Sequence, residues 1–99
     1  MTVRSAFNPR RGANSIATPA AASASVAIDA NAKSVRLVNS GANICYVRIG
    51  TGAQTATTAD TPIRAGSDLI LAKAEGEDTL AHISAAGTTL NIQTGEGGI

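Results

Sequence analysis

Apolar and polar residues alternate in several short segments after residue 25, and this period of two predicts β-strands. The predicted strands cover residues 25–29, 34–39, 43–49, 67–72, 79–84 and 88–94. In the third of them, Cys45, Val47 and Ile49 share one face. No segment carries an apolar helical stripe over about ten residues. The pattern predicts an all-β protein, a small β-sandwich or jelly-roll-like domain of about six strands.

Segments rich in glycine, asparagine and small polar residues separate these strands, as turns do. Residues 39–43 are predicted to form a hairpin loop in which Gly41 takes a positive φ. Gly87 is predicted to serve a tighter turn over residues 85–88. Residues 51–62 form a long polar stretch without a core residue, and loops of that length are usually functional or mobile.

Residues 1–25 lack the alternation and differ in charge from the rest of the chain. Arg4, Arg10 and Arg11 lie there without an acidic residue, although the whole chain has eight basic and seven acidic residues. The segment holds too little apolar surface to offset the entropy of ordering it. The sequence therefore predicts two parts, an extended N-terminal arm (residues 1–25) and a β-sandwich domain (residues 26–99).

The arm supplies the candidate partner-binding residues. Phe7 and Ile16 are its isolated large apolar side chains, which we expect to fill apolar pockets on a neighbouring subunit. We expect the arginines to pair with carboxylates of that neighbour. The predicted partner-binding residues are Arg4, Phe7, Arg10, Arg11 and Ile16. A tail without a role, and a short helix over residues 17–25, remain the alternatives.

The composition limits how stable the domain can be alone. The chain has 99 residues, 2% aromatic content and one cysteine, so one small domain without an internal disulfide is expected. Strands lined by alanine, serine and threonine bury little apolar surface. At about 25 cal/mol per Å², that burial barely exceeds the entropy of ordering a chain of this size. We therefore expect a homo-oligomer, or a protein that docks on a larger assembly.

Residue types that carry chemistry are sparse. Cys45 is predicted to be buried, and His82 is predicted to be partly buried with its hydrogen bonds satisfied. The alternative is a catalytic dyad, which would need a third orienting group and a lowered thiol pKa. Glu75, Glu77 and Asp78 are predicted to form a solvated turn, with an ionic contact to a basic neighbour as the alternative. We predict no catalytic, cofactor-binding or metal-ligating residue, and hence no enzyme and no cofactor.

Two classes of partner are disfavoured by the same composition. No stretch approaches the roughly 18–20 apolar residues of a membrane helix, and no apolar signal-peptide core follows the basic N-terminus. We expect no membrane partner and assembly in a cytoplasm. Stacking on nucleic acid needs a basic face with aromatic side chains, and this chain has one tyrosine and one phenylalanine. No specific nucleic-acid partner is therefore expected.

Four segments carry a resemblance to a known family: SVRLVNSGANICYVRIG at residues 34–50, DTPIRAG at 60–66, LAHISAAG at 80–87 and TLNIQTGEGG at 89–98. In this order they resemble small structural proteins of tailed bacteriophages. The resemblance implies a virion protein of the head decoration (cement) type, which binds the major capsid protein or other virion subunits.

Two other functions stay open. A tail, neck or fibre-attachment component of the virion would differ from a decoration protein in its copy number. A carbohydrate- or receptor-binding module is the alternative from another class. Sugar-binding faces usually present exposed aromatic side chains, and Tyr46 is the tyrosine available for such a face.

Overall fold

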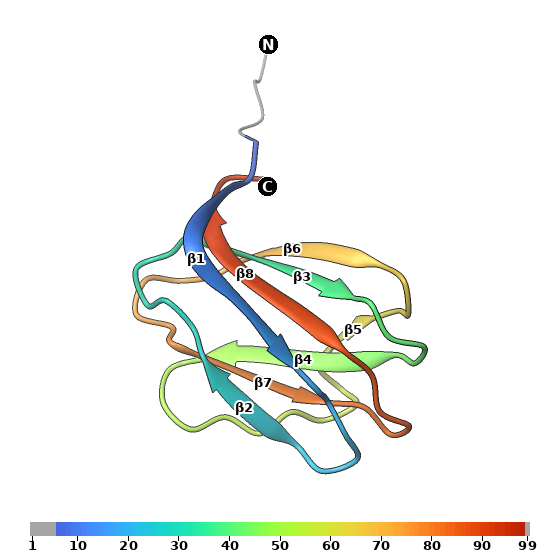
Figure 1. Ribbon diagram of the computed structural model, residues 1–99. Coiled ribbons are helices and arrows are strands. Elements are labelled where there is room, and N and C mark those ends of the chain that lie inside the picture. The colour runs from blue at the N-terminus through green and yellow to red at the C-terminus, as the bar shows by residue number, and fades with distance from the viewer. Residues whose placement is uncertain (1–5, 99) are drawn as a thin grey trace.

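The two layers of the protein are antiparallel β-sheets packed face to face in a computed structural model that describes residues 6–98 (Figure 1). Sheet A has the order β1 (Asn8–Ala17), β8 (Leu90–Glu96), β3 (Ser34–Asn39), β6 (Asp68–Ala72). Sheet B has the order β2 (Ala24–Ala27), β7 (Thr79–Ile83), β4 (Cys45–Gly50), β5 (Thr61–Ile63). The predicted all-β sandwich is confirmed, with eight strands rather than six.

The strands pair as in a long hairpin that has been rolled up. β1 pairs with β8, β2 with β7, β3 with β6 and β4 with β5, all antiparallel. Two further pairings, β3 with β8 and β4 with β7, complete the sheets. Eight strands in two sheets with this nested pairing form a jelly roll.

The core lies between the sheets and is built from the alternating faces of the strands. Its central members are fully buried aliphatic side chains from both sheets: Val35, Leu37, Leu90 and Ile92 from sheet A, and Val47, Ile63 and Leu80 from sheet B. Cys45 joins this cluster with no exposed surface. The face predicted for Cys45 and Val47 is therefore the core face, because residues two apart on a strand point the same way.

Residues 8–17, predicted as part of a free arm, form β1 at the edge of sheet A. Ala17 is 5% exposed and belongs to the core cluster, and Pro19 is also buried. β2 begins at Ala24, inside the predicted arm, and pairs with β7. The structure thus shows no boundary at residue 25, because pairing with β8 and β7 satisfies backbone groups that the sequence alone left without partners.

Two of the predicted loops are corrected. Residues 39–43 are not a hairpin loop, since β3 and β4 lie in different sheets and the segment crosses between them. Gly41 does not have a positive φ, whereas Gly87, predicted to serve a turn, has φ of 84°. The polar stretch 51–62 runs into β5, whose short pairing with β4 spans Cys45 to Val47.

Candidate functional site

Of the five predicted partner-binding residues, the structure describes the side chains of Phe7 and Ile16. Arg4 lies outside the described residues. The backbones of Arg10 and Arg11 belong to β1, but their side chains lie outside what the structure describes. Phe7 is half-buried, and Ile16 is 65% exposed. Ile16 is therefore the one whose described side chain is largely available to a partner.

Phe7 packs against its own chain. A Cβ placed on Gly98 would lie 2.8 Å from Phe7 Cβ and 2.9 Å from Ile70 Cδ1, so the glycine fills a narrow gap between two large side chains. Ser34 Oγ donates hydrogen bonds to Gly95 O and Gly97 O, which fixes the returning C-terminal segment over sheet A. The predicted role of Phe7 in a pocket of a neighbour therefore competes with this packing.

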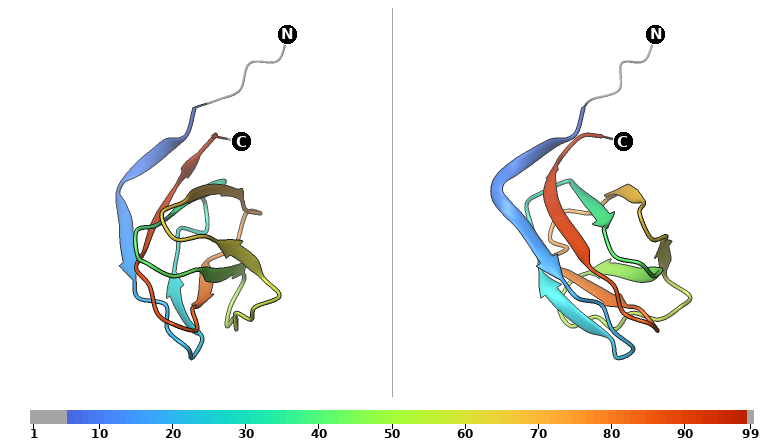
Figure 2. Two further views of the ribbon diagram at one scale, coloured as in Figure 1. Left: turned by 90° about the vertical axis from the view of Figure 1, so that its right-hand side faces the viewer. Right: turned by 45° about the vertical axis from the view of Figure 1, so that its right-hand side comes forward.

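Ile16 lies on the edge strand β1, in the regularly paired part that follows a bend. The register of β1 against β8 shifts between Pro9 and Asn14, which marks a bulge, and Figure 2 shows the bend in the ribbon. Ile16 pairs with Asn91, and both point away from the core because their neighbours Ala17 and Leu90 point into it. The bulge opposes direct strand addition at this edge.

The outward-facing side chains of β3, β6 and β8 form a surface that we call the outer face of sheet A. Val38 lies between Asn91 and Asp68 in the register, and Arg36 lies beside Gln93. The members used below are Arg36, Val38, Asp68, Asn91 and Gln93. A shallow hollow on this face is lined by four of them, without Asp68. Ile70, which pairs with Arg36, faces the same way but lies near Gly98, and Ile16 continues this face onto β1 beside Asn91.

One ion pair crosses this face. Arg36 Nη2 lies 3.2 Å from Asp68 Oδ2, and the two side chains are 40% and 59% exposed. Exposed pairs of this kind contribute about 0–1 kcal/mol to stability, because water screens them and both side chains lose freedom. The fold therefore depends little on this pair, and both side chains can form electrostatic contacts with a partner.

A second hollow, of about 510 Å³, opens at the opposite edge of the sandwich from β1 and β2. Its apolar lining includes Val47, Ile49 and Leu71, and its polar lining includes Asp60 and Glu77. The hollow exists because β5 ends beside Val47 and leaves the rest of β4 without a strand on that side.

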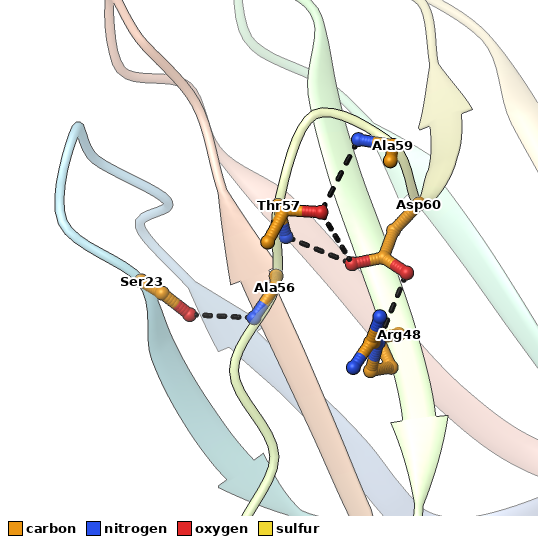
Figure 3. A network of polar contacts seen from close by, with 6 residues as sticks. All are labelled: Ser23, Arg48, Ala56, Thr57, Ala59 and Asp60. Atoms are coloured by element: carbon orange, nitrogen blue, oxygen red, sulfur yellow. Dashed lines mark hydrogen bonds and ion pairs between the residues drawn. The ribbon is translucent and has the colours of Figure 1, made fainter.

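Residues 51–60 are fastened across sheet B, contrary to the expectation of a loop without a core residue. Ala56 is 2% exposed, and its N–H donates to Ser23 Oγ at 2.9 Å, as Figure 3 shows. At the other end, Arg48 Nε donates to Asp60 Oδ1 at 2.9 Å (Figure 3). The loop thus covers part of the sheet rather than projecting as a free tip.

Asp60 and Asp78 anchor this loop as charged acceptors. The Thr57 N–H, followed by Arg48, holds the pKa of Asp60 below its ordinary value. The Gly52 N–H and the Thr79 hydroxyl do the same for the pKa of Asp78. Both carboxylates therefore stay ionised at neutral pH, where they accept these hydrogen bonds.

Cys45 is buried, as predicted. His82 is also buried, at 4% exposed, but its Nδ1 has no hydrogen-bond partner, contrary to the expectation of a satisfied and partly buried histidine. Burial raises the pKa of the Cys45 thiol and lowers the pKa of His82, so both side chains are neutral at pH 7. Asn39 Nδ2 donates to the Cys45 thiol at 3.8 Å. A buried neutral thiol is a poor nucleophile, so this geometry does not favour the catalytic-dyad alternative.

Two of the three carboxylates in the acidic turn at residues 75–78 accept hydrogen bonds from backbone N–H groups of the same chain. Glu77 Oε1 accepts from the Ala74 N–H at 2.6 Å, and Asp78 Oδ1 accepts from the Gly52 N–H at 3.1 Å. Glu75 is exposed. Within residues 6–98, no group of three or more His, Cys, Asp or Glu side chains is arranged to hold a metal ion. The same residues include no helix long and apolar enough to cross a membrane.

From the sequence, the residues of the outer face of sheet A could be assigned to separate strands, but it could not be predicted that they share one surface. The alternation in residues 34–39 and 88–94 indicates which side chains oppose the apolar ones. It does not indicate that β8 and β6 flank β3, because those pairings join segments far apart in the chain. The grouping is therefore a result of the jelly-roll topology.

The geometry defines a jelly-roll β-sandwich with one hollow on the outer face of sheet A and another at the edge beside β5. Comparisons with known proteins agree with the fold. No protein-family model and no curated protein matches the sequence. Among solved structures the chain is similar to one described as "Crystal structure of PirA", with a TM-score of 0.61 and 11% identity. That match covers 86% of this chain and 95% of the other. At this identity the similarity shows the fold alone.

Proposed function

We propose that this protein is a non-enzymatic structural component of a bacteriophage virion, which binds the capsid lattice and reinforces it as a decoration protein. The resemblance of residues 34–98 to small phage structural proteins suggests the setting. The jelly roll is compatible with it, since this architecture occurs in viral capsid and lectin domains, although a fold does not fix a function.

The exposure of Ile16 is the observation that carries the proposal. Ile16 is 65% exposed on an edge strand, and the basic residues Arg10 and Arg11 belong to the same strand. An exposed aliphatic side chain on a strand that also contains two arginines suits a contact with an apolar pocket that has carboxylates in its surroundings. Many such contacts on a repeating lattice give avidity without a strong single site.

Substitution of Ile16 tests this contact better than removal of residues 1–25. That truncation would delete β1 together with Ala17 of the core, so a loss of binding could reflect misfolding. We expect Ile16→Ser to weaken binding to purified capsids at least about tenfold, which corresponds to loss of one buried aliphatic side chain. Ile44→Ser is the matched control, because Ile44 is also exposed, at 40%, but lies outside β1.

The outcomes separate the proposal from its alternatives. Wild-type protein that does not bind capsids would contradict the proposed function, and equal binding by Ile16→Ser would contradict the assigned contact. The number of copies in each particle distinguishes a decoration protein, with hundreds of copies, from a tail, neck or fibre-attachment component.

A further inference from the structure

We propose that the outer face of sheet A docks against the same face of a second copy of this chain, related by a two-fold axis. The docking residues are Arg36, Val38, Asp68, Asn91 and Gln93, the set defined above. This inference does not depend on capsid binding, because it concerns the purified protein alone.

The face is free in the single chain. The other face of sheet A is covered by sheet B, and the returning C-terminal segment reaches the outer face near Ser34 and Ile70. Val38 is half-buried between its neighbours on β6 and β8, and it lines the hollow on this face together with Gln93. A partner can therefore approach the centre of the sheet without displacing part of the fold.

The charges on the face complement themselves. An isologous contact requires that a surface fits its own copy, so residue i of one chain meets residue j of the other and the reverse. Arg36 and Asp68 supply such a pair, since each is exposed and they carry opposite charges on neighbouring strands. The structure gives them one contact, from Nη2 to Oδ2, which leaves donors of the guanidinium for Asp68 of a second copy.

The neutral groups on the face are self-complementary as well. The amides of Asn91 and Gln93 each contain two donors and one acceptor, so amide can pair with amide across a two-fold axis. Val38 provides apolar area between the polar groups, and the hollow beside it offers space for a side chain of the other copy. This combination of an apolar centre and paired polar groups is the ordinary anatomy of a protein interface.

A charge exchange tests the geometry directly. The measurement is the weight-average mass by analytical ultracentrifugation over a range of protein concentrations, at low and high salt. Wild-type protein should associate with increasing concentration. Arg36→Asp leaves only acidic groups at the pair, and Asp68→Arg leaves only basic ones, so each variant alone should associate at least tenfold more weakly. An equimolar mixture should recover wild-type association, because each copy then meets the opposite charge.

Matched controls separate this contact from attraction between oppositely charged proteins. Arg48→Asp and Glu75→Arg make the same changes in net charge at exposed residues away from the face. Each control should associate as the wild type does, and their mixture should show no added association. Circular dichroism and thermal melts of all four variants establish that the proteins are folded.

Several results would overturn the proposal. One is a wild-type protein that stays monomeric at every concentration. If Arg36→Asp also weakens capsid binding of such a monomer, the face binds the capsid protein instead of a second copy. Others are single variants that associate normally, and a mixture that fails to recover. Loss of self-association in Arg36→Asp with capsid binding retained would leave the proposed function intact, so the two proposals can fail separately.

Discussion

Asn39 and Thr88 lie 49 residues apart, and the Thr88 hydroxyl donates a hydrogen bond of 2.7 Å to Asn39 Oδ1. The same oxygen accepts from the Gly41 N–H at 3.2 Å. Asn39 Nδ2 donates to Asn43 O at 2.8 Å and to Ile63 O at 2.9 Å. One fully buried amide therefore joins the end of β3 to β5 and to the connection between β7 and β8.

Asn39→Asp should destabilise the protein severely. The substitution keeps the shape of the side chain but replaces its two donors with an acceptor that faces the carbonyls of Asn43 and Ile63. We expect the free energy of unfolding to fall by at least about 3 kcal/mol in urea denaturation at pH 7. Asn91→Asp is the control and should change it by less than about 1 kcal/mol, because the Ser40 hydroxyl that Asn91 contacts can donate instead. Equal effects of the two substitutions would contradict the role of Asn39.

Gly41→Ala should also be destabilising, through close approach of the backbone. A Cβ on Gly41 would lie 2.6 Å from Thr89 N and 3.0 Å from Thr88 Cα, so main chain would have to move. We expect a loss of about 1–3 kcal/mol, measured by thermal or urea unfolding. Gly50→Ala is the comparison, because the atoms nearest to its Cβ would belong to the Gln54 side chain, which can rotate away. A larger loss for Gly50→Ala than for Gly41→Ala would show that this reasoning is wrong.

His82 should make the protein less stable in mild acid. It is 4% exposed, its Nδ1 has no hydrogen-bond partner, and burial lowers its pKa from the ordinary value of about 6.5. The unfolded chain therefore takes up a proton near pH 6.5, whereas the folded protein takes it up only at lower pH. The free energy of unfolding should fall as the pH decreases below about 6.5, by at most about 1.4 kcal/mol per unit, until the lowered pKa of the folded state is reached.

His82→Leu isolates this effect, because the chain has one histidine. Urea unfolding midpoints at pH 7.5 and pH 5.5 should differ in the wild type and nearly coincide in the variant. The carboxylates whose pKa values are lowered lose their contribution only at more acidic pH. A variant that retains the full difference would assign the acid sensitivity to other groups.

Asp60→Ala should release the loop over sheet B without unfolding the sandwich. It removes the ion pair with Arg48 and the acceptor for the Thr57 N–H. We expect hydrogen exchange at residues 51–60 to rise at least tenfold while exchange in β4 and β7 stays near that of the wild type. Glu75→Ala, at an exposed position, should leave both unchanged. Because the pKa of Asp60 is lowered, the wild-type loop should remain fastened until the pH falls through that lowered pKa.

The strands with a clear apolar–polar alternation could be predicted from the sequence. β1 and β5, in which this alternation is weak, could not. β3 and β8 carry apolar residues at every second position over most of their length, and these residues form the core. β1 has little apolar character apart from its end, so its extended pairing with β8 was not visible locally. β5 is three residues long and contains Pro62, within a stretch that reads as polar loop.

Some buried polar residues also had no local signal. Lys73 is 7% exposed, and its Nζ donates to the carbonyl oxygens of Ala30, Ala32 and Ala74. Nothing in the residues around Lys73 marks these acceptors, because two of them come from a segment about forty residues earlier. Lysine is rarely buried, and it can be here because its three donors are satisfied.

The sequence by itself determined the all-β class, which side chains of the core strands point inward, and the glycine turn at Gly87. These features depend on side-chain alternation and on backbone freedom within a few residues. Only the tertiary structure decided that residues 8–17 complete sheet A and that Arg36, Asp68 and Gln93 share one face. Those outcomes depend on which strands become neighbours, and in this jelly roll the first two strands pair with the last two.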